Sequence, residues 1–266
     1  MRSKRIRVRH RSARSLRMAV ALLFVALGLY VASLWLQTGR QTESPPPQNA
    51  EMVASERTFP VLGGYFVQLH RARDASTARI EAARHMRRGA AGYVMQDGES
   101  YLVIGALYDA KEEAEAVVSR LIEREGIAAE VVARQFGGVK LRVTATQAQI
   151  DAFFLGEESL RPLTSRLAEL AQQLDQGKIG IEPAARQIGL IHEESALRLH
   201  ALRDALGGDE HPLMRRLCAL YELMEQATGD AALNAAQSPL SFSAKIKYNS
   251  ISMRLQHLGF LHELAA

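Results

Sequence analysis

The histidines and the single cysteine of the chain are the residue types that could hold a metal ion or start covalent catalysis. His192-Glu193-Glu194 begins like the HExxH zinc motif, but Ala196 stands where the second histidine would be. None of the histidines after residue 144 has a glutamate three positions before it, which a di-iron bundle would need. Cys218 lies on an apolar helical stripe, where a thiol usually packs in a core. The sequence therefore predicts no catalytic residue, no metal site, no cofactor and no enzymatic activity.

A different group of polar side chains lies in residues 64–72, GYFVQLHRA. Alternation predicts a strand whose core face carries Tyr65, Val67 and Leu69. The opposite face would carry Phe66, Gln68 and His70, with Arg71 following. An aromatic ring, an amide and an imidazole on one face predict either a binding surface or the solvated side of a strand.

Residues 62–136 repeat one arrangement of elements twice. Each copy is a strand, a helix and a second strand, and the predicted strands are 65–69, 92–95, 101–104 and 129–133. An aspartate suited to an N-cap precedes each helix and a glycine suited to the left-handed conformation follows it: Asp74, Gly89, Asp109 and Gly126. Asp97-Gly98 predicts a hairpin turn between the two copies.

The order β-α-β-β-α-β predicts an α+β, ferredoxin-like sheet with both helices on one face. The residues expected under the helices are Tyr65, Val67, Leu69, Leu102 and Ile104. The other face is expected to stay open and to present Phe66, Gln68, His70, Tyr101 and Val103.

With these elements assigned, residues 62–136 resemble the SPOR domain (sporulation-related repeat). The first strand of that family usually reads Tyr-x-Val-Gln, as residues 65–68 do. Its third strand ends in a Gly-Pro-Phe-like segment before a helix rich in Glu and Ala, and here GALY (105–108) precedes DAKEEAEA. The resemblance implies binding of peptidoglycan, notably glycan strands stripped of stem peptides, by wall-facing proteins of cell division or sporulation.

The resemblance also implies which residues would contact the glycan: Phe66, Gln68, His70, Arg71, Tyr101 and Val103. Gln68 matches the family's first-strand glutamine, which lies on its glycan-binding face. Phe66 and Tyr101 would stack on a sugar ring. The sequence departs from the family at His70 and Arg71, where small residues are frequent, and these two side chains would meet a carboxylate or a hydroxyl.

The amino-terminal segment predicts a membrane anchor. Residues 1–17 form a basic tail with eight Lys/Arg and no acid, and residues 18–36 are uncharged. We expect a transmembrane helix over 18–37 with the tail in the cytoplasm and the rest of the chain outside it. Val31-Ala32-Ser33 leaves a cleaved signal peptide as the alternative. Residues 38–60, with three consecutive prolines, are predicted to be a flexible linker.

Charge and periodicity describe the remainder of the chain. Without its tail, the chain holds 25 basic and 29 acidic residues, so nothing in its net charge indicates a nucleic-acid partner. Leucines and isoleucines at helical spacing in 144–266 predict about four helices in an antiparallel bundle. This half resembles no family that we recognise, and its basic last helix could contact a protein partner.

These observations leave two main hypotheses. The first is a non-enzymatic, membrane-anchored protein that binds denuded glycan through a SPOR-like domain at 61–137. The second is an extracytoplasmic scaffold whose bundle binds a protein partner while the ferredoxin-like domain is only structural. A wall hydrolase is disfavoured because no coherent set of acid, base or metal-binding residues is present.

Overall fold

The structure, a computed structural model, describes residues 51–207, 211–233 and 238–265. The predicted tail (1–17), the predicted membrane helix (18–37) and residues 38–50 of the predicted linker lie outside these ranges. Within them, no helix is both long and apolar enough to cross a bilayer. The chain from Glu51 onward is one compact unit of the α+β class, in which antiparallel sheets precede four long packed helices.

The first part of this unit contains the predicted β-α-β-β-α-β order. Its elements are β2 (Leu62–Ala72), α2 (Ala75–Met86), β3 (Tyr93–Asp97), β4 (Ser100–Tyr108), α3 (Lys111–Glu125) and β5 (Glu130–Phe136). The four strands form one antiparallel sheet in the order β3-β4-β2-β5. The helices α2 and α3 both cover one face of this sheet, where Val67 packs near Ala114 and Val103 packs near Ala78.

One of the two predicted aspartate caps is confirmed and the other is wrong. Asp74 accepts a hydrogen bond from the Thr77 N–H at 2.8 Å and caps α2. The N-cap of α3 is Ala110, with no side-chain hydrogen bond. Asp109 instead pairs with Arg254 at 2.8 Å, because a buried cation requires a counter-charge.

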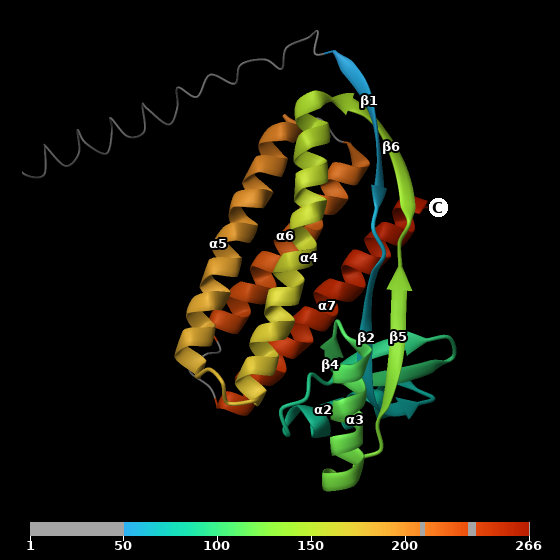
Figure 1. Ribbon diagram of the computed structural model, residues 1–266, viewed down its shortest axis with the longest axis vertical. Coiled ribbons are helices and arrows are strands. Elements are labelled where there is room, and N and C mark those ends of the chain that lie inside the picture. Colours follow the sequence, from blue (N-terminus) through green and yellow to red (C-terminus); the bar gives the residue numbers. More distant parts are fainter. Residues whose placement is uncertain (1–50, 208–210, 234–237, 266) are drawn as a thin grey trace, which may run out of the picture. The chain divides into compact units, whose positions relative to one another are not determined.

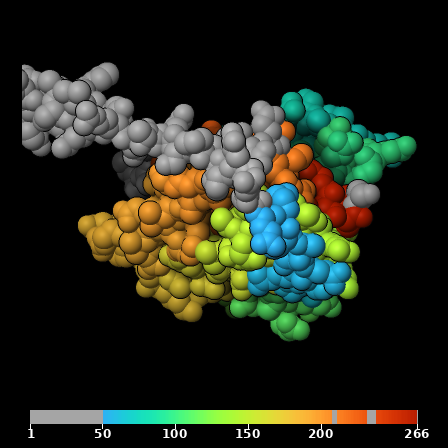
Figure 2. Space-filling view, turned by 90° about the horizontal axis from the view of Figure 1, so that it is seen from above, coloured from blue at the N-terminus to red at the C-terminus, as the bar shows by residue number. Residues whose placement is uncertain are grey.

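A two-stranded ribbon extends the pair β2 and β5 beyond the ends of these two strands. The strands β1 (Met52–Phe59) and β6 (Val139–Thr146) pair in the register already set by β2 and β5, so that Phe59 faces Val139 and Leu62 faces Phe136. Figure 2 shows β1, in blue, beside the yellow-green segment that contains β6. The prediction of a flexible linker is therefore wrong for residues 52–59.

The kink between the ribbon and the sheet depends on Gly137. A Cβ atom at this position would lie 2.3 Å from the Cα of Val61, so no side chain fits. The ribbon then leads directly into the bundle, because Thr146 forms a capping box with Gln149 at the start of the next helix.

The predicted helical bundle is confirmed in the described residues. Its members are α4 (Gln147–Asp175), α5 (Ile181–Leu206), α6 (Pro212–Leu233) and α7 (Pro239–Ala265), shown in Figure 1. Gly156 lies inside α4 and allows close packing. A Cβ there would be 3.0 Å from Leu217, and its carbonyl accepts a hydrogen bond from Tyr221.

The last helix also covers the face of the sheet that was expected to stay open. Ile251 of α7 is fully buried in a cluster with Phe66 and Leu102. The sheet therefore has α2 and α3 on one face and α7 across part of the other. The division into a separate domain at 61–137 and a bundle at 144–266 is not seen, since β5 continues into β6 and α7 shares a core with the sheet.

Candidate functional site

Two irregularities in the pairing of β2 with β4 decide which side chains share a face. The pairing passes from Val67–Ala106 to Gln68–Ile104 and then to His70–Val103, so that Gly105 and then Leu69 are left without a partner. Gly105 allows the close approach of Leu69, because a Cβ there would lie 2.6 Å from the Cδ1 of Leu69 and would force that side chain to move. Such bulges bend a strand and redirect its side chains.

The bulges place three predicted ligand residues on the wrong face. His70 pairs with Val103, which is fully buried against α2. Tyr101 packs at the edge of the same cluster. Conversely, Leu102 is on the face away from α2 and α3. The predictions that His70, Tyr101 and Val103 present themselves on an open face are therefore wrong.

Phe66 lies on the predicted face but is not available to a ligand. Its side chain is completely buried, with Ile251 of α7 in the same apolar cluster. Ile104, which was predicted to lie under α2 and α3, belongs to this cluster too. The apolar part of this face is thus core. A ligand surface on this face must lie on the part of the sheet that α7 does not cover.

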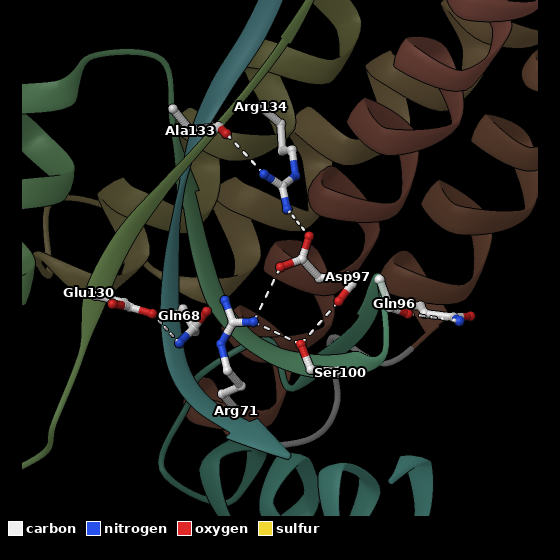
Figure 3. Close-up of polar contacts among 9 residues, drawn as sticks. Gln68, Arg71, Gln96, Asp97, Ser100, Glu130, Ala133 and Arg134 are labelled. Atoms are coloured by element: carbon white, nitrogen blue, oxygen red, sulfur yellow. Dashed lines mark hydrogen bonds and ion pairs between the residues drawn. The ribbon is translucent and has the colours of Figure 1, made fainter. Parts of the chain in front are cut away.

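Gln68 and Arg71 belong to a group of polar residues contributed by all four strands (Figure 3). The Gln68 side-chain amide donates to the carboxylate of Glu130 on β5. The guanidinium of Arg71 donates to the Ser100 hydroxyl at 2.7 Å and to the Asp97 carboxylate at 3.3 Å. We call this group the polar cluster, and it comprises Gln68, Arg71, Asp97, Ser100, Glu130 and Arg134.

Asp97 joins the two sides of the polar cluster. One of its carboxylate oxygens pairs with Arg71 and the other with Arg134 (Figure 3). The two arginines are open to solvent, with side chains 49% and 38% exposed for Arg71 and Arg134, whereas Gln68 is buried at 6% exposed. The two cations are matched by two carboxylates, those of Asp97 and Glu130, so the surface has little net charge.

The chemistry offered by this cluster is hydrogen bonding to a polar, neutral ligand. Guanidinium groups donate, carboxylates accept, and Gln68 Oε1 is buried without a hydrogen-bond partner in the described chain. No group of three or more potential metal ligands occurs among the described residues. The polar cluster contains no cysteine or histidine nucleophile and no serine beside a histidine.

Two tyrosines add an aromatic surface to the same face. Tyr93 of β3 and Tyr248 of α7 have ring centroids 5.1 Å apart, and Tyr248 is 37% exposed. The ammonium of Lys245 lies 6.0 Å from the Tyr248 ring centroid. Burial of Tyr93 and the nearby Tyr248 phenol raise the pKa of Tyr93, so that its hydroxyl stays protonated.

Comparison with protein-family models, with curated proteins and with solved structures finds no match to this chain. The site therefore has to be interpreted from its own residues.

The sequence predicted Gln68 and Arg71 but not their partners. Asp97 and Ser100 flank the hairpin turn that the sequence did predict. Polar residues are common beside such turns, so their presence there gave no reason to expect a binding surface. Glu130 lies in the predicted strand 129–133 and Arg134 directly follows that strand, four positions after Glu130, so a strand longer by one residue would place both on one face. That spacing was the available signal for the β5 side of the polar cluster.

Proposed function

We propose that the protein is a membrane-anchored, non-enzymatic protein that binds denuded peptidoglycan glycan through the polar cluster, in cell division or sporulation. In this proposal residues 62–136 form a ferredoxin-like, SPOR-type unit. The observation that carries the proposal is the position of Gln68. It occupies the strand position at which the resembling family has its glutamine, on the face away from α2 and α3. Gln68 itself is 6% exposed, beside the solvent-exposed arginines Arg71 and Arg134 of the polar cluster.

The composition of the cluster suits a sugar better than a charged ligand. A glycan presents closely spaced hydroxyl groups that both donate and accept, and the cluster offers guanidinium donors beside carboxylate acceptors. Tyr248 supplies the exposed ring on which a sugar face could stack, in place of Phe66 and Tyr101.

The proposed location follows from the amino-terminal sequence. The uncharged residues 18–37 would anchor the chain, and the basic tail would keep the amino terminus in the cytoplasm. The unit from Glu51 onward would then face the wall.

A cosedimentation assay with purified sacculi tests this function. The full-length chain in a non-ionic detergent is the right sample, because α7 shares a core with the strands and the 62–136 fragment lacks it. We expect severalfold more protein to pellet with sacculi that an amidase has stripped of stem peptides than with untreated sacculi. Equal pelleting with both preparations, or none with either, would contradict the proposal.

A second candidate function is a protein-interaction scaffold. It is favoured by Leu190 and Leu197 of α5, which are seven positions apart on one face of the helix and 57% and 72% exposed. In that case the double variant L190D/L197D would lose a copurifying protein from cells while retaining its binding to stripped sacculi. If the double variant retained every copurifying protein, the scaffold function would have no support at this face.

A further inference from the structure

A pocket lies where β4 stops and the bundle takes its place beside β2. The last residue of β4, Tyr108, pairs with Tyr65, so the preceding residues of β2 have no strand on that side. Arg254 of α7 occupies the vacant position and donates to the carbonyl of Gly63. The pocket measures about 320 Å³, and its lining includes Gly64, Asp109, Arg134, Arg161, Ser165 and Arg254.

Arg254 is an almost completely buried cation at the wall of this pocket. Its side chain is 3% exposed, and it contacts Asp109 at 2.8 Å and the Ser165 hydroxyl at 3.2 Å. Its Nε has no hydrogen-bond partner among the described residues. Burial, together with the positive charge of Arg161, lowers the pKa of Arg254, whereas Asp109 opposes that effect. A buried donor without a partner calls for an explanation, and a bound ion is one of those that occur in proteins.

Arg161 adds a second cation, which has no carboxylate partner among the residues that the structure describes. Its guanidinium donates to the carbonyls of Pro60 and Val61, at 3.2 and 2.9 Å, and these oxygens carry no formal charge. Arg134 is a third guanidinium in the lining, and its carboxylate partner, Asp97, is in the polar cluster and not in the pocket. The pocket lining therefore contains three guanidinium groups and one carboxylate, that of Asp109, whose side chain is 52% exposed.

We propose that this pocket binds a small oxyanion, a carboxylate or a phosphate group, between Arg161 and Arg134 with Arg254 behind them. Planar guanidinium groups bind such anions through paired hydrogen bonds, and each of these arginines has donors beyond those already used. The anion would relieve the repulsion among the cations and tie the ribbon, α4 and α7 together. This site goes beyond the glycan-binding function and does not require it.

A purely structural role is the alternative. Arg161 and Arg254 satisfy carbonyls that would otherwise be unpaired, and that role alone could place them here. It gives no reason for an anion to stabilise the protein, so the two explanations differ in a measurable property.

The test is a titration of the full-length chain with sodium phosphate at constant ionic strength, made up with sodium chloride, while the melting temperature is recorded. We expect the melting temperature to rise with phosphate and to saturate, as it does when a ligand binds only the folded state. In Arg161→Gln, the phosphate concentration needed for half of the rise should increase at least tenfold. The matched control is Arg166→Gln on the same helix, whose partner is Glu194 and which lies outside the pocket.

The quantity compared is the phosphate concentration that gives half of the rise in melting temperature. The melting temperature without phosphate is not compared, since Arg161→Gln also loses its hydrogen bonds to the carbonyls of Pro60 and Val61. If Arg161→Gln does not fold, Arg134→Gln serves instead, because that side chain is partly exposed. A parallel titration with sodium acetate shows whether carboxylate or phosphate binds more tightly. The proposal is overturned if neither anion gives a saturable rise, or if Arg166→Gln weakens the response as much as Arg161→Gln does.

Discussion

Phe66 is the residue whose environment differs most between an open sheet and this structure. Its ring is fully buried in a cluster that includes Ile251. Phe66→Ala should therefore lower the free energy of unfolding by about 3–5 kcal/mol, the usual cost of emptying a phenylalanine site. Chemical denaturation of the full-length chain measures this change.

Arg71→Ala is the matched control for that variant, because Arg71 lies on the same strand and is exposed. Its removal should change the free energy of unfolding by no more than about 1 kcal/mol. A Phe66→Ala variant as stable as the control would mean that the ring faces solvent and that α7 does not cover this face.

Tyr108 gives the stability of the protein a dependence on alkaline pH. Burial, and to a smaller extent the charge of Asp175, raises the pKa of Tyr108 to about 12. The phenol of an unfolded chain ionises near pH 10, so the stability that the neutral phenol provides is complete below about pH 10 and is lost as the pH rises toward 12. Wild type should lose up to about 3 kcal/mol more than Tyr108→Phe over this interval.

Denaturation curves of both proteins at pH 9, 10 and 11 check this difference. Because other tyrosines ionise in both proteins, the comparison isolates Tyr108. Parallel loss of stability in the two proteins would place the Tyr108 hydroxyl in solvent.

The alternation of residues predicted β2 correctly up to Leu69 and failed after it. Tyr65, Val67 and Leu69 do pack under α3, as expected. His70 turns to the other face because the bulge at Leu69 shifts the pairing by one residue. Only the partner strand shows such a shift, so the sequence of β2 alone could not reveal it.

Among the elements, the strand β1 was missed because it directly follows a proline-rich segment and was counted with it as linker. Phe59 is 2% exposed, and its ring lies 5.9 Å from that of Phe154 and 6.3 Å from that of Phe153. Phe59→Ala should cost about 3–5 kcal/mol of unfolding free energy, measured by chemical denaturation. Its control is Thr58→Ala at the exposed neighbouring position, which should stay within about 0.5 kcal/mol of wild type. A flexible linker predicts no effect for either variant.

The strand β4 shows why the two faces of the sheet were exchanged in the prediction. Its residues 101–104, Tyr-Leu-Val-Ile, are apolar on both faces, because α2 covers one face and α7 covers the other. A strand buried on both faces shows no alternation of apolar and polar residues, so its sequence does not indicate which side chains lie under which helix. The helices α4, α5 and α6 were predictable because each carries an apolar stripe of its own. The helix α7 is buried on several sides, and its position across the sheet depends on contacts distant in sequence.

At the scale of the whole molecule, the sheet and the bundle share cores instead of meeting at a linker. One apolar cluster includes Phe59 of the ribbon, Val139 of β6 and Phe260 of α7, and a second joins the strands to Ile251. The polar cluster is therefore held on a body whose strands are fixed by the last helix of the chain. Gln68 and Arg71 lie on one strand, and the pairing of the strands brings to them partners that are 26 to 62 residues away in sequence.

We propose that the polar cluster, and not the face that contains Tyr101, contacts the glycan. Cosedimentation of two full-length variants with amidase-treated sacculi tests it most directly. Arg71→Gln, which removes a charge from the cluster, should reduce the bound fraction severalfold. Tyr101→Phe, on the side of α2, should bind like wild type. The reverse pattern, with Tyr101→Phe impaired and Arg71→Gln unaffected, would contradict this account.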